Sequence, residues 1–190
     1  MATTQPIRNK HQIHQLINYY KQKNQPRNYV LTVICLHTAL RISDVLRLTC
    51  NDVYDFAKNR PKKSITLTEQ KTGKSKTIAL HKNIIQALKS YYHLAKPGAP
   101  LILNSQTGKA ITRVQAYRLL RAAADALSFT QRVSCHSLRK TFGYHAWKRG
   151  VSPAIIMEIF NHNSLAVTKR YLGVTQDEMN HVYMDIGFVA

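Results

Sequence analysis

Four residues in the last third of the sequence combine the side-chain types needed to cut a phosphodiester bond: His136, Arg139, His162 and Tyr171. His136 and Arg139 stand three positions apart, and residues at that spacing share one face of a helix. In phosphoryl transfer the non-bridging oxygens gain negative charge, which Arg, Lys and His donors stabilise. Arginine suits this task because its planar guanidinium can bond two oxygens at once. The pair therefore predicts a phosphate-binding site at a helix start.

Tyr171 is the candidate nucleophile. It follows His162 by nine residues. An attack by tyrosine would leave a covalent intermediate and would need a general acid for the departing 5′-oxygen. Because tyrosine side chains have a pKa of about 10, a cationic cluster would also favour the developing phenolate. Among the ten tyrosines of the chain, Tyr144 and Tyr183 are interpreted as packing residues.

Two segments upstream of His136 contain further basic residues of interest. Residues 38–44 contain Arg41 and, three positions later, Asp44. Residues 70–74 contain Lys71 within a turn-rich stretch between two β-leaning runs. Taken alone, an arginine at the end of an apolar segment is interpreted as a surface charge, and a lysine on a turn as a solvated side chain.

The combined pattern resembles the phage integrase or tyrosine recombinase family over about residues 8–173. The resemblance implies that six positions form the catalytic set: Arg41, Lys71, His136, Arg139, His162 and Tyr171. It implies that the two arginines clamp the scissile phosphate and that the two histidines bond its oxygens and assist proton transfer. The lysine would protonate the leaving 5′-hydroxyl, the tyrosine would form a 3′-phosphotyrosyl link, and Asp44 would brace the site. Lys74 and Lys76 are near enough to take the role of Lys71.

Two positions depart from the family pattern. Ala39 stands where the family usually has glycine before Leu-Arg, and is interpreted as a small-residue packing variant. Asn161 stands where glycine precedes the histidine, a mild change because asparagine tolerates the left-handed conformation. Few residues precede the predicted helices, although such recombinases commonly carry an N-terminal core-binding domain. The chain is therefore either an excised catalytic domain or a short stand-alone recombinase.

The periodicity around these residues predicts a mainly α (α+β) fold, a helical bundle with a small antiparallel β-sheet. Ser43 and Ser152 are predicted N-caps, and Gly150 is a predicted helix terminator. The hairpin is expected to pair 64–68 with 76–80. Helices are expected at 8–22, from Pro26 through Leu40, from Ser43 through Leu48, and at 82–95, 112–127, 137–149 and 152–160.

The chain is expected to divide into a catalytic domain, 1–174, and a C-terminal tail helix, 175–190. Thr175 and Glu178 form a capping-box pattern. Residues 174–190 contain three of the nine acids of the chain and no Lys or Arg, so this tail is not expected to lie on DNA. Its apolar stripe, which needs a protein surface, predicts docking onto a neighbouring protomer: Met179, Val182, Tyr183 and Ile186.

The composition favours a polyanionic partner. The sequence has 28 Lys and Arg against 9 Asp and Glu, a net charge of +19, with a pI near 10.1. Such a charge indicates double-stranded DNA first and an anionic membrane surface second. Three cysteines without a CxxC pair and nine histidines without metal spacing predict neither a zinc site nor a disulfide. We expect no metal, cofactor or small-molecule substrate, no membrane segment and a cytoplasmic, nucleoid-associated protein.

These observations predict a site-specific DNA recombinase, for integration, excision or inversion. The resemblance implies a homo-tetramer on two DNA sites. Three alternatives remain at this point. The chain could relax DNA as a type IB topoisomerase does, regulate as a non-catalytic DNA-binding protein of the same fold, or bind RNA through its charge.

Overall fold

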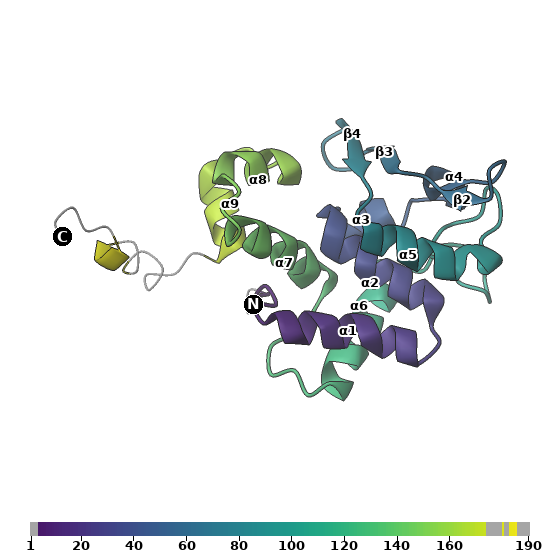
Figure 1. The fold of residues 1–190 in the computed structure, drawn as a ribbon, viewed down its shortest axis with the longest axis horizontal. Helices are drawn as coiled ribbons and strands as arrows, with labels where there is room; N and C mark the ends of the chain where they lie inside the picture. The colour runs from purple at the N-terminus through teal and green to yellow at the C-terminus, as the bar shows by residue number, and fades with distance from the viewer. Residues whose placement is uncertain (1–3, 174–179, 181–182, 186–190) are drawn as a thin grey trace.

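The computed structural model describes residues 4–173, 180 and 183–185 (Figure 1). The predicted tail capping box, Thr175 with Glu178, lies outside the described residues, as do Met179, Val182 and Ile186 of the predicted stripe. Tyr183, the remaining member of that stripe, is described and is 79% exposed.

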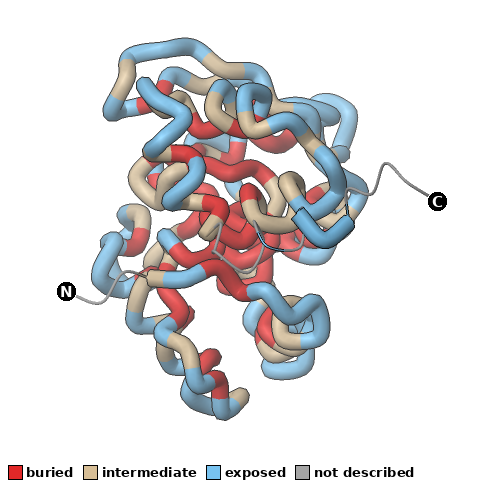
Figure 2. Tube along the Cα trace, turned by 90° about the vertical axis from the view of Figure 1, so that its left-hand side faces the viewer, coloured by how far each residue is buried: buried red, intermediate tan, exposed pale blue. Residues whose placement is uncertain are grey.

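Helix α2 (Pro26–Thr38) is the centre of the molecule. It is buried along most of its length because apolar side chains occur on all its faces, and α1, α5 and α7 pack around it (Figures 1 and 2). These neighbours are α1 (Lys10–Gln22), α5 (Lys82–Tyr91) and α7 (Cys135–Trp147), with α6 (Arg113–Ala126) against α1 and α7. The main hydrophobic core therefore surrounds α2.

A small β-rich layer follows α2. Two short helices, α3 (Ile42–Val45) and α4 (Cys50–Val53), lead into a two-residue pairing of β1 (Tyr54–Asp55) with β2 (Arg60–Pro61). The predicted hairpin is confirmed: β3 (Ser64–Thr68) pairs antiparallel with β4 (Ser75–Ala79). The register sets Thr68 opposite Ser75, so the intervening loop begins at Glu69 and carries Lys71.

Helices α8 (Pro153–Phe160) and α9 (Leu165–Leu172) form a lobe beyond α7 (Figure 1). They pack on α7 and on each other. Their buried residues belong to a small second cluster made of Ala39, Ile156, Phe160 and Leu172. The nucleophile candidate Tyr171 packs against this cluster.

The element boundaries confirm most predictions and correct three. The capping box of Thr112 with Gln115 and the cap at Ser152 are present, but Ser43 lies inside α3, whose N-cap is Arg41. Helix α7 begins two residues earlier than predicted, because Ser134 caps it. The helix from Lys82 ends at Tyr91, and a 3₁₀ turn, η1 (Tyr92–Leu94), replaces its expected last turn.

Candidate active site

The turn after α2 positions both candidate arginines. Ala39 caps α2 in the left-handed conformation (φ 56°) and is fully buried. Its carbonyl oxygen accepts a hydrogen bond from Nη1 of Arg139, which lies on α7. The sequence-based interpretation of Ala39 as a packing variant was therefore incomplete. The position requires a positive φ, which glycine adopts without strain and which costs other residues about 1–2 kcal/mol.

Arg41 and Arg139 converge on one backbone oxygen at the end of α8. The carbonyl of Phe160 accepts from Nη2 of Arg139 at 2.7 Å and from Nη2 of Arg41 at 3.2 Å. The Arg139 guanidinium also lies 4.6 Å from the centroid of the Phe160 ring. Burial, followed by the charge of Arg41, lowers the pKa of Arg139 to about 10, so the Arg139 guanidinium stays cationic at neutral pH. Two predicted clamp residues are thus brought together.

Two buried acids balance this charge. Glu69, which precedes the hairpin turn, pairs with Arg41 across 2.7 Å between Oε2 and Nη1. Asp44 accepts a hydrogen bond of 2.9 Å from the backbone N–H of Gln70, so it contacts the same turn. Sequence reasoning had singled out Asp44 and missed Glu69. The available signal was an acid beside Lys71 in a chain with few acids.

Tyr171 lies between the two candidate histidines. Its ring packs edge-on against His136, with centroids 4.8 Å apart, and against His162, with centroids 4.5 Å apart. The Tyr171 hydroxyl is 3.5 Å from Nδ1 of His136, a long contact that a small movement would shorten. Nδ1 of His162 is 3.1 Å from the hydroxyl of Thr168, which fixes the orientation of its ring.

Both histidines are neutral at physiological pH. Burial, and to a smaller extent the nearby charges of Lys140, Arg139 and Arg41, together lower the pKa of His136 to about 4. Burial and the same two arginines lower the pKa of His162 to about 4. Neutral imidazoles can accept a proton as well as donate one, which a site that must deprotonate a tyrosine requires.

The candidate lysines occupy different environments. Lys71 is exposed on the hairpin turn, and within the described ranges it makes no hydrogen bond or ion pair. Lys76, on β4, is partly buried, and its Nζ donates to the carbonyl of Ile159. The pKa of Lys76 is lowered overall. Burial is the largest cause, and the charges of Arg139 and Arg41 act in the same direction, whereas the charge of Glu69 opposes them. In this structure the inner lysine is therefore Lys76, and the predicted Lys71 stands at the rim.

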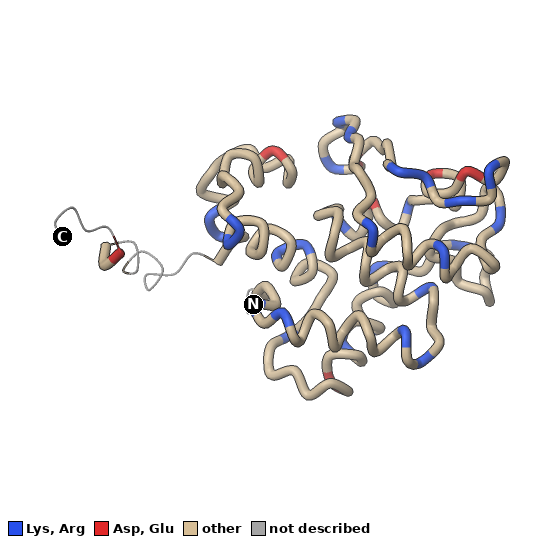
Figure 3. The backbone as a smooth tube through the Cα atoms, viewed as in Figure 1, with Lys and Arg blue, Asp and Glu red and all other residues tan. Residues whose placement is uncertain are grey.

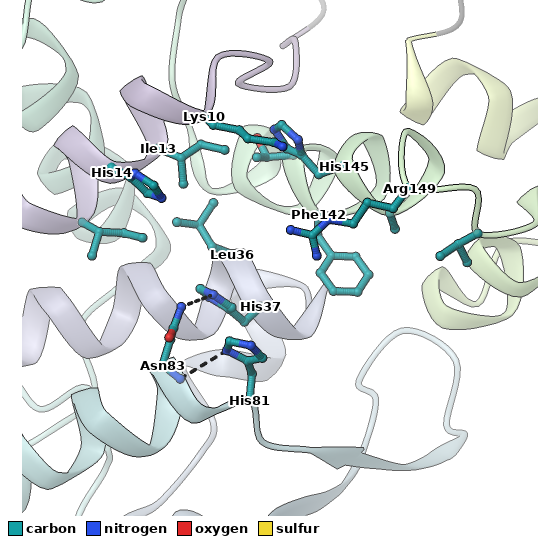
Figure 4. Close-up of a pocket in the computed structure, with 14 residues that line it drawn as sticks. Lys10, Ile13, His14, Leu36, His37, His81, Asn83, Phe142, His145 and Arg149 are labelled. Atoms are coloured by element: carbon teal, nitrogen blue, oxygen red, sulfur yellow. Dashed lines mark hydrogen bonds between the residues drawn. The ribbon is translucent and has the colours of Figure 1, made fainter.

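Lys and Arg residues are spread over many elements of the backbone, whereas Asp and Glu are few (Figure 3). A separate cavity of about 420 Å³ lies between α1, α2, α5 and α7 (Figure 4). Its lining includes His37 and His81, which stack with centroids 5.2 Å apart, but none of the six predicted catalytic residues. The catalytic candidates lie elsewhere and differ in exposure: Arg139 is buried, Arg41, His162 and Tyr171 are partly buried, and Lys71 and His136 are exposed.

The described part of the chain contains neither a metal-binding cluster nor a membrane-spanning helix. No group of three His, Cys, Asp or Glu residues there is arranged to hold a metal ion. None of its helices is both long and apolar enough to cross a membrane.

Comparison with known proteins identifies relatives of the whole chain. A family model described as "Phage integrase family" matches residues 8–178. A Bacillus subtilis protein named "Probable integrase/recombinase YoeC" is 36% identical over 187 residues, which covers 98% of this chain and 99% of that protein. Tyrosine recombinase XerD of Mycobacterium leprae is 28% identical over 83% of this chain, which spans about half (51%) of XerD.

Solved structures share the fold. The crystal structure of XerA recombinase superposes with a TM-score of 0.76 at 19% identity, covering 96% of this chain and 65% of that one. XerH bound to a palindromic difH substrate, in a post-cleavage complex, gives 0.76 at 18% identity over 93% of this chain and 51% of that one. The catalytic domain of bacteriophage HP1 integrase gives 0.62 at 19% identity over 96% and 95% of the two chains. The predicted fold class is confirmed.

Proposed function

The chain belongs to the phage integrase family of tyrosine recombinases, and we propose that it cuts and rejoins double-stranded DNA at specific sites through Tyr171. Relatives named as integrases and recombinases, and a relative bound to its DNA site, favour this function over DNA relaxation or regulation. The charge of +19 supports DNA as the partner. The cytoplasmic nucleoid is the proposed place of action.

The proposed chemistry follows from the placement of six side chains. Arg41 and Arg139 bond the non-bridging oxygens of the scissile phosphate and stabilise its transition state. The Tyr171 oxygen attacks phosphorus, the P–O5′ bond breaks, and a 3′-phosphotyrosyl link forms. The proton of Tyr171 passes to neutral His136, and Lys71 protonates the departing 5′-oxygen. His162 bonds a phosphate oxygen.

The same link supports rejoining. A 5′-hydroxyl from the partner strand gives its proton to Lys71 and attacks the phosphotyrosyl phosphorus, and Tyr171 leaves with a proton returned by His136. One phosphodiester is broken and one is formed, so no nucleotide is consumed. One observation carries the proposal: the hydroxyl of Tyr171 lies beside a neutral histidine whose helix also presents Arg139.

The experiment uses a trapped covalent adduct. The binding site is first selected from a pool of random duplexes with the Tyr171→Phe protein, which binds without cutting. The selected duplex is then nicked beside each candidate phosphate, so that the released fragment diffuses away. Wild type should form a protein–DNA adduct that Tyr171→Phe lacks and Tyr144→Phe retains. An adduct that persists in Tyr171→Phe would disprove the assignment.

The oligomer and the tail are further proposals. We infer that four protomers act on two DNA sites and that residues 175–190 dock onto a neighbouring protomer. The acidic and apolar composition of this segment supports docking onto a basic protein. Deleting 175–190 should spare cleavage of a single site and impair the pairing of two sites, measured by native gel. Unchanged recombination by the truncated protein would contradict the docking.

A further inference from the structure

Glu69 is the acid at which three segments of the site meet. Its side chain is fully buried, with 0% exposure, and it lies between the end of β3 and the turn that carries Lys71. Three hydrogen bonds converge on one of its oxygens, Oε2. They come from Nη1 of Arg41 at 2.7 Å, Oγ1 of Thr72 at 3.0 Å and Nδ2 of Asn161 at 2.8 Å.

Each of these donors belongs to a different part of the proposed machinery. Arg41 is a clamp arginine, Thr72 follows Lys71 on the hairpin turn, and Asn161 precedes His162. Asn161 adopts the left-handed conformation (φ 49°) that ends α8 and turns the chain toward His162. One carboxylate oxygen therefore joins residues that are 28 and 92 positions away from it in sequence.

The carboxylate that accepts these bonds is ionised. Burial raises the pKa of Glu69, but the hydrogen bonds from Asn161, Arg41 and Thr72 and the charge of Arg41 outweigh it, so the pKa is lowered overall. A glutamine with its oxygen at the position of Oε2 would accept the three bonds only as a weaker, neutral acceptor. Its N–H₂ would then be buried at the position of Oε1, where the described residues form no hydrogen bond. The glutamine would also leave Arg41 without its counter-charge beside Arg139 and Lys76.

We propose that Glu69 is a positioning residue for strand cleavage, fixing Arg41 and the turn before His162 relative to the Lys71 hairpin. This inference rests on the proposed function, because it concerns the geometry of the same phosphate site. Glu69 does not touch the reacting atoms. It acts by holding groups that do, and a misplacement of about 1 Å in such a group can lower a rate by roughly 10²-fold.

The first test separates cleavage from DNA binding. Single-turnover cleavage of the nicked duplex is measured at saturating protein for Glu69→Gln and for a matched control, Asp125→Asn. Asp125 is exposed on α6, where it pairs only with Arg121. Glu69→Gln should cleave on the order of 10²-fold more slowly. The dissociation constant for DNA is measured in a Glu69→Gln protein that also carries Tyr171→Phe, so that no cleavage occurs. It should stay the same or fall, because a negative charge is lost. Asp125→Asn should cleave at the wild-type rate.

Two outcomes would overturn the proposal. Cleavage of Glu69→Gln at the wild-type rate would show that the negative charge of Glu69 positions nothing. A rise in the dissociation constant that accounts for the whole loss would show a general loss of structure instead. Thr72→Val, which removes a single bond to Oε2, provides a milder variant should Glu69→Gln fold poorly, and it should lower the cleavage rate less.

The second test asks whether Glu69 acts through the turn before His162. Asn161→Gly keeps the backbone conformation and removes only the Nδ2 bond. If the two residues act together, Asn161→Gly should lower the cleavage rate much less in Glu69→Gln than in wild type. Equal effects in both backgrounds would contradict the link. The same four proteins, unfolded in urea, should show the same non-additivity in stability. The free energy of unfolding therefore tests the coupling of Glu69 to Asn161 even if the wild type forms no adduct with DNA. The absence of that adduct would disprove the proposed function and not the coupling.

Discussion

Arg139 lies on a helix that packs into the main core, whereas Tyr171 lies on α9, whose apolar face joins a second and smaller cluster. The main core surrounds α2 and includes Leu138, the neighbour of Arg139 in sequence. The smaller cluster has four buried members, and one of them, Ala39, comes from the turn after α2. Arg139, a proposed phosphate-binding residue, and Tyr171, the proposed nucleophile, are therefore supported by different amounts of buried surface.

The junction between these regions is centred on Phe160. Its carbonyl accepts from Arg41 and Arg139, and its ring packs under Arg139 and 5.4 Å from the ring of Tyr171. Regions with less buried apolar surface open at lower free energy than the core of the same protein. We therefore expect the α8–α9 lobe to adjust the position of Tyr171 while the arginines stay in place.

The largest expected effect concerns the lysines that flank this junction. Lys71→Ala should slow cleavage about 10²–10⁴-fold, as loss of a general acid does. A duplex with sulfur in place of the scissile 5′-oxygen should restore the rate, because a thiolate leaves without a proton. Lys76→Ala, which loses the contact with Ile159 of the lobe, should be slowed with either duplex. Rescue of Lys76→Ala and not of Lys71→Ala would transfer the general-acid role to Lys76.

The next largest effect is expected for Arg139, which lies on the core-packed helix α7. Arg139→Lys keeps the charge but cannot bond both Ala39 and Phe160, so cleavage should fall about 10²–10³-fold, as when one oxyanion donor is lost. Single-turnover rates measure this, with the exposed Arg149→Lys as the control. A near-normal rate in Arg139→Lys would mean that charge alone, and no defined geometry, supports the reaction.

A smaller effect, on stability, is expected from a substitution that disturbs the packing around Phe160. A Cβ added at Gly143 on α7 would lie 2.6 Å from Cζ and 2.8 Å from Cε2 of Phe160. Alanine normally stabilises a helix interior relative to glycine by roughly 1 kcal/mol. Here the overlap should reverse the sign, and Gly143→Ala should destabilise the protein by about 1–3 kcal/mol in urea unfolding. Greater stability would show that the lobe moves aside freely.

The sequence predicted which side chains gather at the candidate site better than it predicted the residues that support them. The spacing of His136, Arg139 and His162 placed these residues correctly, because one helix and one turn determine their relation. Helix α9 was not predicted, since a helix of eight residues with a short apolar face has a weak periodic signal.

Long-range contacts were the part that the sequence could not predict. The bond from Arg139 to Ala39 joins residues 100 positions apart, and no local pattern shows that the turn at Ala39 is left-handed. For the same reason Glu69 was missed, and Lys76 was named only as an alternative to Lys71. Their burial depends on how the hairpin meets the end of α8, which is a property of the packed fold.

The smallest effect is the pH dependence of stability. His136 comes from the core-packed helix and His162 from the lobe, and each has a folded-state pKa of about 4, below the value of about 6.5 for unfolded chains. Between these values the unfolded chain binds protons that the folded one does not. Stability should therefore be full above pH 6.5 and fall as the pH falls toward 4. Urea midpoints measure this fall. His136→Asn should make it shallower, whereas the exposed His93→Asn should not.

DNA should change that pH dependence in a predictable direction. A phosphate placed between the histidines favours their charged forms, so binding should take up protons and tighten as the pH falls from 6.5 toward 4. The Tyr171→Phe protein isolates binding from cleavage. His136→Asn and His162→Asn should each remove part of the proton uptake. Both histidines contact Tyr171. Equal losses of proton uptake in His136→Asn and His162→Asn would therefore mean that the phosphate contacts the core-packed helix α7 and the α8–α9 lobe at the same time. A loss confined to His136→Asn would mean that DNA first binds the core-packed side and that the α8–α9 lobe closes afterwards.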